Sequence, residues 1–159
     1  MDPTKSTQCP RCHSEVATFL HLAWQCPEVN GYWQRVVERV QRTTNTLCPM
    51  DPRIVLLGGF TKTKEKKMQY KFTQLLLILA KRRVAISWMG LRVPQIEKWE
   101  GDVREWALAE EVRLRKCRHD EKLEEELKIW KAFLDKWKST DDARDLLSLS
   151  ALTLRTPCR

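Results

Sequence analysis

Four potential metal ligands lie within CPRCHSEVATFLHLAWQC, the segment of residues 9–26. Cys9 and Cys12 form one closely spaced pair, and His21 and Cys26 form a second pair. Thiolates and imidazoles in two such pairs are typical of tetrahedral structural zinc sites, and a Cys-x2-Cys turn leaves backbone amides to hydrogen-bond the sulfur atoms. The pattern therefore predicts one zinc ion bound by these four side chains.

The second pair can face one ion only if the chain leaves helical geometry between its two members. On an ideal helix, residues five positions apart point about 140° away from each other. Pro27 disfavours helical geometry at the residue before it. We therefore expect a short helix over Thr18–Gln25 to stop at Cys26, so that the Cys26 thiol can turn back toward His21.

Two alternatives remain open at this level. His13 lies next to Cys12 and could replace His21 as the fourth ligand. The cluster could also be ordinary core, because buried thiols behave as small hydrophobic side chains and a helix histidine can be satisfied by hydrogen bonds. The other cysteines have no paired spacing and are interpreted as plain thiols: Cys48, Cys117 and Cys158.

The opening residues MDPTKSTQC contain no charged-then-apolar leader, and the longest apolar run is LLLILA. A membrane span needs roughly 18 apolar residues. We therefore expect a protein of the nucleus or cytoplasm that is neither secreted nor membrane-embedded. In a reducing compartment, six cysteines favour free thiols or metal ligation over disulfides.

The net charge of +8 is concentrated in residues 60–93, which hold nine Lys and Arg residues and one acidic residue. A localised basic segment is typical of a polyanionic partner, because each neutralised phosphate releases counterions. The alternative is a solvated helix face, the usual role of charge runs. On the first interpretation, RNA or DNA phosphates contact basic side chains of the ligand-bearing segment of residues 9–26, here called the clip, and of residues 60–93. These side chains are Arg11, Lys62, Lys64, Lys66, Lys67, Lys71, Lys81, Arg82 and Arg83.

Apolar residues at helical spacing predict an all-α fold, a small helical domain with an N-terminal Cys-Cys-His-Cys zinc-knuckle-like turn. A helix from Glu28 would bury Val29, Tyr32, Trp33, Val36, Val37 and Val40. A loop rich in Pro and Gly follows, with at most one short helical or extended piece. Further helices are expected over about Lys64–Met89, ended by Gly90, and from Pro94. A heptad-like helix would carry Leu123, Leu127, Trp130, Leu134 and Trp137 on one face.

We divide the chain into three parts. Residues 1–59 hold the clip, one amphipathic helix and the loop. Residues 60–138 hold the basic core helix and the Trp-rich helices, and we expect them to pack with the first part as one domain. Residues 139–159 lose the aromatic residues and are expected to form a disordered tail.

Five blocks of the sequence together resemble a known family. They are CPRC…HLAWQCPEVNGYW, DPRIVLLGG, LLLILAKRRVAISWMG, PQIEKWEGDVREW and LKIWKAFLDKW. In this order, over about Cys9 to Trp137, they resemble the C-terminal region of the reverse transcriptase polyprotein of LINE-type non-LTR retrotransposons. Ala132 stands where the family pattern has a proline, and residues after Lys138 have no counterpart in it.

The resemblance implies a cysteine-rich domain that follows the endonuclease, polymerase and thumb. It implies binding of RNA or DNA during target-primed reverse transcription, with the metal-type positions of the family at Cys9, Cys12, His21 and Cys26. The chain has no aromatic-x-Asp-Asp motif to hold the two metal ions of a polymerase. Asp141-Asp142 lies in a polar tail with no strand pattern. We therefore expect a nucleic-acid-binding protein that is not an enzyme.

Two rival functions follow from the same sequence. The heptad-like face from Leu123 to Trp137 could dock a partner helix, which would make the chain a protein-interaction module. The chain could also be the translation of a decayed retroelement without a selected role. The intact clip and the regular helical patterns argue against extensive decay.

Overall fold

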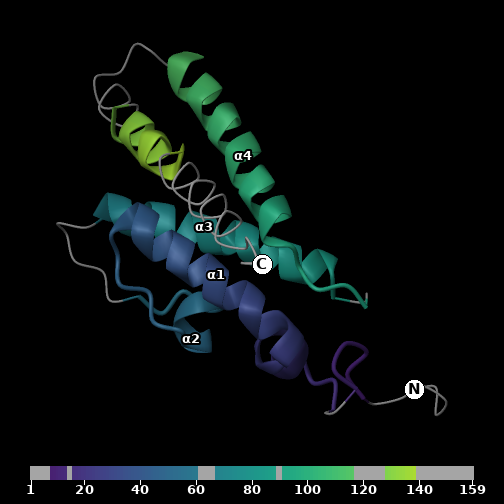
Figure 1. The fold of residues 1–159 in the computed structure, drawn as a ribbon. Helices are drawn as coiled ribbons and strands as arrows, with labels where there is room; N and C mark the ends of the chain where they lie inside the picture. The colour runs from purple at the N-terminus through teal and green to yellow at the C-terminus, as the bar shows by residue number, and fades with distance from the viewer. Residues whose placement is uncertain (1–7, 14–15, 61–66, 89–90, 117–127, 139–159) are drawn as a thin grey trace, which may run out of the picture. The chain divides into compact units, whose positions relative to one another are not determined.

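The computed structural model describes residues 8–13, 16–60, 67–88, 91–116 and 128–138 (Figure 1). In order along the chain the elements are η1 (His21–Gln25), α1 (Pro27–Thr44), α2 (Pro52–Val55), α3 (Lys67–Ile86) and α4 (Ile96–Lys116), followed by a helix over residues 128–138. An isolated antiparallel bridge joins Gln8 to Val16, and the described ranges contain no strand. The predicted all-α fold class is confirmed.

The chain divides into two compact units, Met1–Glu105 and Trp106–Arg159. Residues 1–59 and residues 60–105 belong together to the first unit, in which α1 packs against α3, whereas residues 106–138 of the predicted second part belong to the second unit. The boundary of that unit lies instead within α4. The predicted tail, residues 139–159, lies outside the described residues.

Helix α1 has the predicted buried face. Proline at its first position and an extended Cys26 (φ −56°, ψ 125°) begin the helix, and Asn45 ends it in left-handed geometry (φ 51°). The predicted core positions are all buried: Val29, Tyr32, Trp33, Val36, Val37 and Val40. Arg39, near the C-terminal end of α1, is also buried, with only 2% of the residue exposed.

Helices α1 and α3 lie side by side and form the centre of the first unit (Figure 1). The Tyr32 hydroxyl donates to the Ala80 carbonyl at 3.0 Å, and the Trp33 indole N–H donates to the Ala23 carbonyl of η1 at 2.8 Å. The large aromatic residues of α1 therefore bury apolar rings while their polar atoms bond the neighbouring elements.

Helix α3 ends at Ile86, three residues before the predicted end. Ser87 still bonds the last turn, with its hydroxyl donating to the Val84 carbonyl at 3.0 Å and its amide to the Arg83 carbonyl at 3.1 Å. The predicted start at Lys64 and the predicted Gly90 cap lie outside the described residues. Leu76, Leu77 and Ala80 are buried as the apolar centre of the helix predicts.

Helix α4 starts two residues after Pro94, and its first half completes the first unit. Ile96, Trp99 and Val103 are buried, and the Trp99 indole N–H donates to the Leu76 carbonyl of α3 at 3.1 Å. Asp102 is buried and pairs with Arg83 of α3.

In the second unit, Trp106 of α4 packs edge-to-face against Trp130 of the following helix, with ring centroids 4.8 Å apart. Phe133 stacks on Trp130 at 5.2 Å and approaches Trp137 at 6.3 Å. These rings form an aromatic cluster that buries Trp130, Phe133 and Trp137.

Candidate metal centre

The structure brings together the four side chains that the spacing selected. One ligand atom from each of Cys9, Cys12, His21 and Cys26 lies within 4.8 Å of every other. The Cys9 and Cys26 sulfur atoms are 3.8 Å apart, and the Cys12 sulfur lies 3.3 Å from His21 Nε2. A tetrahedral zinc ion with Zn–S bonds of about 2.3 Å separates two sulfur ligands by about 3.8 Å. The donor set and its spacing therefore fit a single metal ion.

A short loop presents the first pair. The bridge between Gln8 and Val16 closes the loop, and the His13 amide donates to the Cys9 carbonyl at 2.9 Å. His13, directly after the second cysteine, adopts left-handed geometry with φ 55°. This tight turn aims the Cys9 and Cys12 thiols toward the same point.

A helical turn of unusual width presents the second pair. The Cys26 amide donates to the His21 carbonyl at 2.8 Å, so η1 closes a five-residue π turn in place of a four-residue one. Such turns are rare and are found disproportionately at functional sites. Cys26 itself is non-helical before Pro27, as predicted. The π turn and the non-helical Cys26 together bring positions 21 and 26 to the same side, which the ideal-helix argument did not allow.

The polar surroundings favour the charged form of one thiol of the cluster, that of Cys9. Burial opposes ionisation of Cys9, but the backbone amides of Cys12 and Arg11 outweigh it and hold the pKa of this thiol below its ordinary value. Burial also opposes protonation of His21, but the thiols of Cys9 and Cys12 outweigh it and raise the pKa of the imidazole. Burial raises the pKa of the Cys26 thiol to about 11. A cation at the centre of the cluster would stabilise all three thiolates together.

The structure distinguishes His21 from His13, which the spacing left open. His21 is only 1% exposed and belongs to the cluster, whereas His13 is exposed on the loop. Cys48 is a free, buried thiol outside the cluster, as its isolated position predicts. Cys117 and Cys158 lie outside the described residues.

Arg11 makes contacts within the fold rather than with solvent. Its side chain is buried, one terminal nitrogen donates to the Leu22 carbonyl at 2.9 Å and the other donates to the Ser87 carbonyl at 2.8 Å. The guanidinium thus connects the clip to η1 and to the end of α3. We therefore do not retain Arg11 among the candidate phosphate contacts.

The basic residues at the end of α3 are partly engaged within the fold. Arg83 forms two hydrogen bonds to the buried Asp102 carboxylate, and Arg82 lies 3.5 Å from the same carboxylate with 61% of its side chain exposed. The Lys81 ammonium donates to the Leu56 carbonyl at 3.0 Å. Lys71 is exposed on α3. Lys62, Lys64 and Lys66 lie outside the described residues, as does the side chain of Lys67.

The predicted partner-docking face is engaged within the second unit. Trp130 and Trp137 are buried in the aromatic cluster, and Leu134 is half-buried. Leu123 and Leu127 lie outside the described residues. The sequence analysis missed Phe133, which stacks on Trp130 but falls between the heptad positions.

No protein-family model matches this chain, and no solved structure matches it. Among the described residues, none of the helices has the length and apolar character required to cross a membrane.

Proposed function

We propose that this chain is a zinc-stabilised, non-catalytic domain that binds RNA or DNA through phosphate contacts. We further propose that it derives from the C-terminal region of a LINE-type reverse transcriptase. The observation that carries the proposal is the convergence of three sulfur atoms and one imidazole nitrogen at tetrahedral spacing. Structural zinc sites use this donor set, and their ions contribute directly to folding.

The basic segment supports the nucleic-acid part of the proposal. Lys71 and Arg82 are both exposed and lie eleven positions apart on α3. Eleven residues rotate about 20° beyond three full turns, so both positions are on one side of the helix, about 16 Å apart along its axis. We propose that both contact phosphates, as do Lys62, Lys64, Lys66 and Lys67 of the same basic segment of the sequence.

Metal binding is tested by purifying the full chain and measuring its metal content by mass spectrometry. We expect about one zinc ion per chain. His21→Asn and Cys9→Ser should lose at least half of the metal, because each removes one of four ligands. His13→Asn and Cys48→Ser are the matched controls and should retain it; asparagine also tolerates the left-handed geometry at position 13. Full metal content in the His21→Asn and Cys9→Ser proteins would exclude this site.

Nucleic-acid binding is tested by titrating a single-stranded RNA and a duplex DNA over a salt series. We expect non-specific affinity of about 1 to 100 μM at physiological salt, falling steeply as salt increases. The double variant Lys71→Gln/Arg82→Gln should reduce the slope of log K against log salt by about 1.5 to 2.

The control is Arg35→Gln/Lys98→Gln, which removes the same charge from exposed positions outside the basic segment. This control should leave the slope nearly unchanged. Equal slopes for the two double variants would show that binding depends on total charge alone and would contradict a phosphate-contacting surface on α3.

A further inference from the structure

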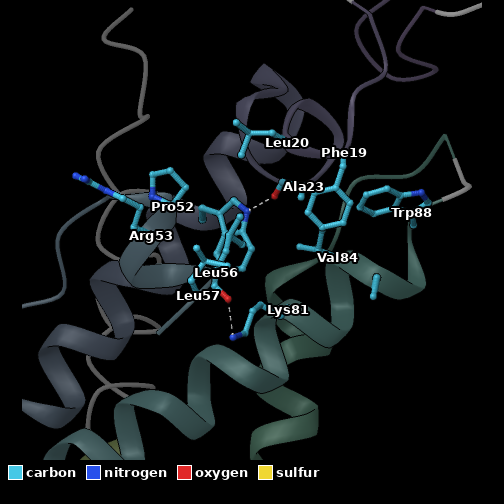
Figure 2. Close-up of a pocket in the computed structure, with 12 residues that line it drawn as sticks. Phe19, Leu20, Ala23, Pro52, Arg53, Leu56, Leu57, Lys81, Val84 and Trp88 are labelled. Atoms are coloured by element: carbon cyan, nitrogen blue, oxygen red, sulfur yellow. Dashed lines mark hydrogen bonds between the residues drawn. The ribbon is translucent and has the colours of Figure 1, made fainter. Parts of the chain in front are cut away.

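An apolar groove of about 490 Å³ opens on the surface of the first unit, between η1, α2 and the second half of α3 (Figure 2). Its lining includes Phe19, Leu20, Leu57, Val84 and Trp88, with Trp33 beneath. The volume falls within the range of about 300 to 1,000 Å³ typical of ligand-binding clefts. No acidic residue of the described chain lines it.

The edges of this groove expose large apolar side chains. Phe19 is 70% exposed and Leu57 is 81% exposed. Phe19 packs against Trp88 with ring centroids 4.8 Å apart, so the two rings stand together at one side of the groove (Figure 2). Contiguous exposed apolar surface of this kind is typical of protein-interaction sites.

The charged residues that line the groove, Arg53 and Lys81, are both cations. Arg53 pairs with Asp51 and points away from the groove (Figure 2). The Lys81 ammonium lies in the groove and donates to the Leu56 carbonyl. An ammonium has three N–H donors, and Lys81 has no second hydrogen-bond partner among the described residues. Burial also lowers the pKa of Lys81, as expected for a cation that is incompletely solvated.

We propose that this groove binds an acidic amphipathic helix of a partner protein. Large apolar side chains at positions i, i+3, i+4 and i+7 of the partner would fill the groove between Phe19, Leu57 and Trp88. A partner carboxylate would accept from the Lys81 ammonium. This inference does not depend on the metal or nucleic-acid proposals, because it uses different residues.

Charge favours this occupant over two others. A second copy of the chain would also carry a net charge of +8 and would be repelled at low and moderate salt. A nucleic-acid strand gains affinity by neutralising several phosphates, whereas the lining supplies a single inward-facing cation. An acidic apolar helix complements both the lining and the charge.

The test uses synthetic amphipathic peptides that share one leucine pattern at i, i+3, i+4 and i+7. Glutamates fill the polar positions of the first peptide and glutamines those of the second; the third keeps the glutamates but replaces its leucines with serine. Fluorescence anisotropy of each labelled peptide is measured against the full chain. We expect the glutamate peptide to bind at least tenfold more tightly than the glutamine peptide, and the serine peptide not to bind.

Variants then locate the site. Leu57→Ser and Phe19→Ser should each weaken binding of the glutamate peptide at least tenfold, and circular dichroism should show an unchanged fold because both side chains are exposed. Ile86→Ser, at an exposed position of α3 outside the groove, is the control. Lys81→Met should lower the preference for glutamate over glutamine at least fivefold, whereas Lys98→Met, which removes the same charge elsewhere, should not.

Three results would overturn the proposal. The first is that Leu57→Ser and Phe19→Ser both bind the glutamate peptide as the unmodified chain does. The second is that the chain sediments as a dimer that Leu57→Ser dissociates, which would identify a second copy as the occupant. The third is that single-stranded RNA displaces the peptide and Leu57→Ser weakens RNA binding, which would assign the groove to nucleic acid. The metal-content test is independent of all three.

Discussion

At the scale of single residues, the four clustered ligands are distinguished by geometry rather than by type. Cys48 and Cys9 are both buried free thiols, and His13 lies closer to Cys12 in the sequence than His21 does. Cys9 and His21 contribute to the cluster, whereas Cys48 and His13 do not. The sequence could nominate the ligands because the Cys-x2-Cys turn is local. It favoured His21 but left His13 open, because the choice depends on the burial of one histidine and the exposure of the other.

Arg11 illustrates a second limit at this scale. Its position between two thiol ligands suggested an exposed cation for phosphate binding. Burial of its guanidinium depends on the Ser87 carbonyl, 76 positions away in the sequence, and no local pattern reveals that contact.

We predict that Arg11→Lys lowers the free energy of unfolding by about 1 to 3 kcal/mol, because lysine keeps the charge but cannot donate to the Leu22 and Ser87 carbonyls in the fork geometry of arginine. Chemical denaturation followed by circular dichroism measures the loss. Arg35→Lys, an exposed position on α1, should change stability by less than about 0.5 kcal/mol. A stable Arg11→Lys protein with weakened RNA binding would instead favour the phosphate-contacting role.

At the scale of elements, helical periodicity predicted the features that depend on the local sequence, such as the apolar face of a helix. The apolar part of the buried face of α1 was predicted, because six apolar residues repeat at helical spacing. The polar residues that complete this face, Arg39, Thr43 and Thr44, were not predicted, because they carry no apolar signal. The predicted C-terminal end of α3 lies three residues after the observed end, and the predicted start of α4 lies two residues before the observed start. Those ends depend on tertiary contacts such as the bond between Arg11 and Ser87, which propensity does not contain.

The end of α2 depends on backbone geometry. Helix α2 ends at Val55, and the turn that follows it closes at Gly58, whose amide donates to the Ile54 carbonyl at 2.9 Å and whose φ of +75° is left-handed. A side chain at Gly58 would meet open space, so any cost of substitution comes from the backbone.

We predict opposite effects for two glycine substitutions. Gly58→Ala should lower the free energy of unfolding by about 1 kcal/mol, because alanine disfavours positive φ. Gly31→Ala, inside α1 with no atom near the added Cβ, should raise it by up to about 1 kcal/mol, because glycine weakens helices. Thermal and chemical unfolding of both variants would measure the difference. Equal effects of the same sign would contradict the assigned backbone roles.

At the scale of the whole molecule, the chain is two compact units, with the metal cluster and the groove both in Met1–Glu105. The sequence predicted one helical domain and could not predict this division, because α4 continues without a break across the boundary at Glu105. The groove was also missed. Phe19 and Leu57 appeared as ordinary apolar residues of a helix and a loop, and only the packing shows that they remain exposed.

We predict that chelation of the metal affects one unit selectively. If the ion stabilises Met1–Glu105, its removal should increase amide hydrogen exchange in η1, α1 and the end of α3, because the clip contacts all three directly or through Arg11. Peptides from residues 107–116 and 128–138 should keep their protection. Hydrogen-exchange mass spectrometry with and without a chelator measures both, and uniform loss across the two units would contradict a local role of the metal.

The double contact of Arg11 also has a consequence for the order in which a nascent chain acquires structure. All four ligands have been translated by residue 26, long before the ribosome reaches Ser87. If an ion binds at that stage, the Arg11 guanidinium can donate to the Leu22 carbonyl, whereas its second acceptor, the Ser87 carbonyl, is not yet synthesised. The end of α3 would then dock onto an Arg11 side chain that the metal-bound loop and η1 already hold in place.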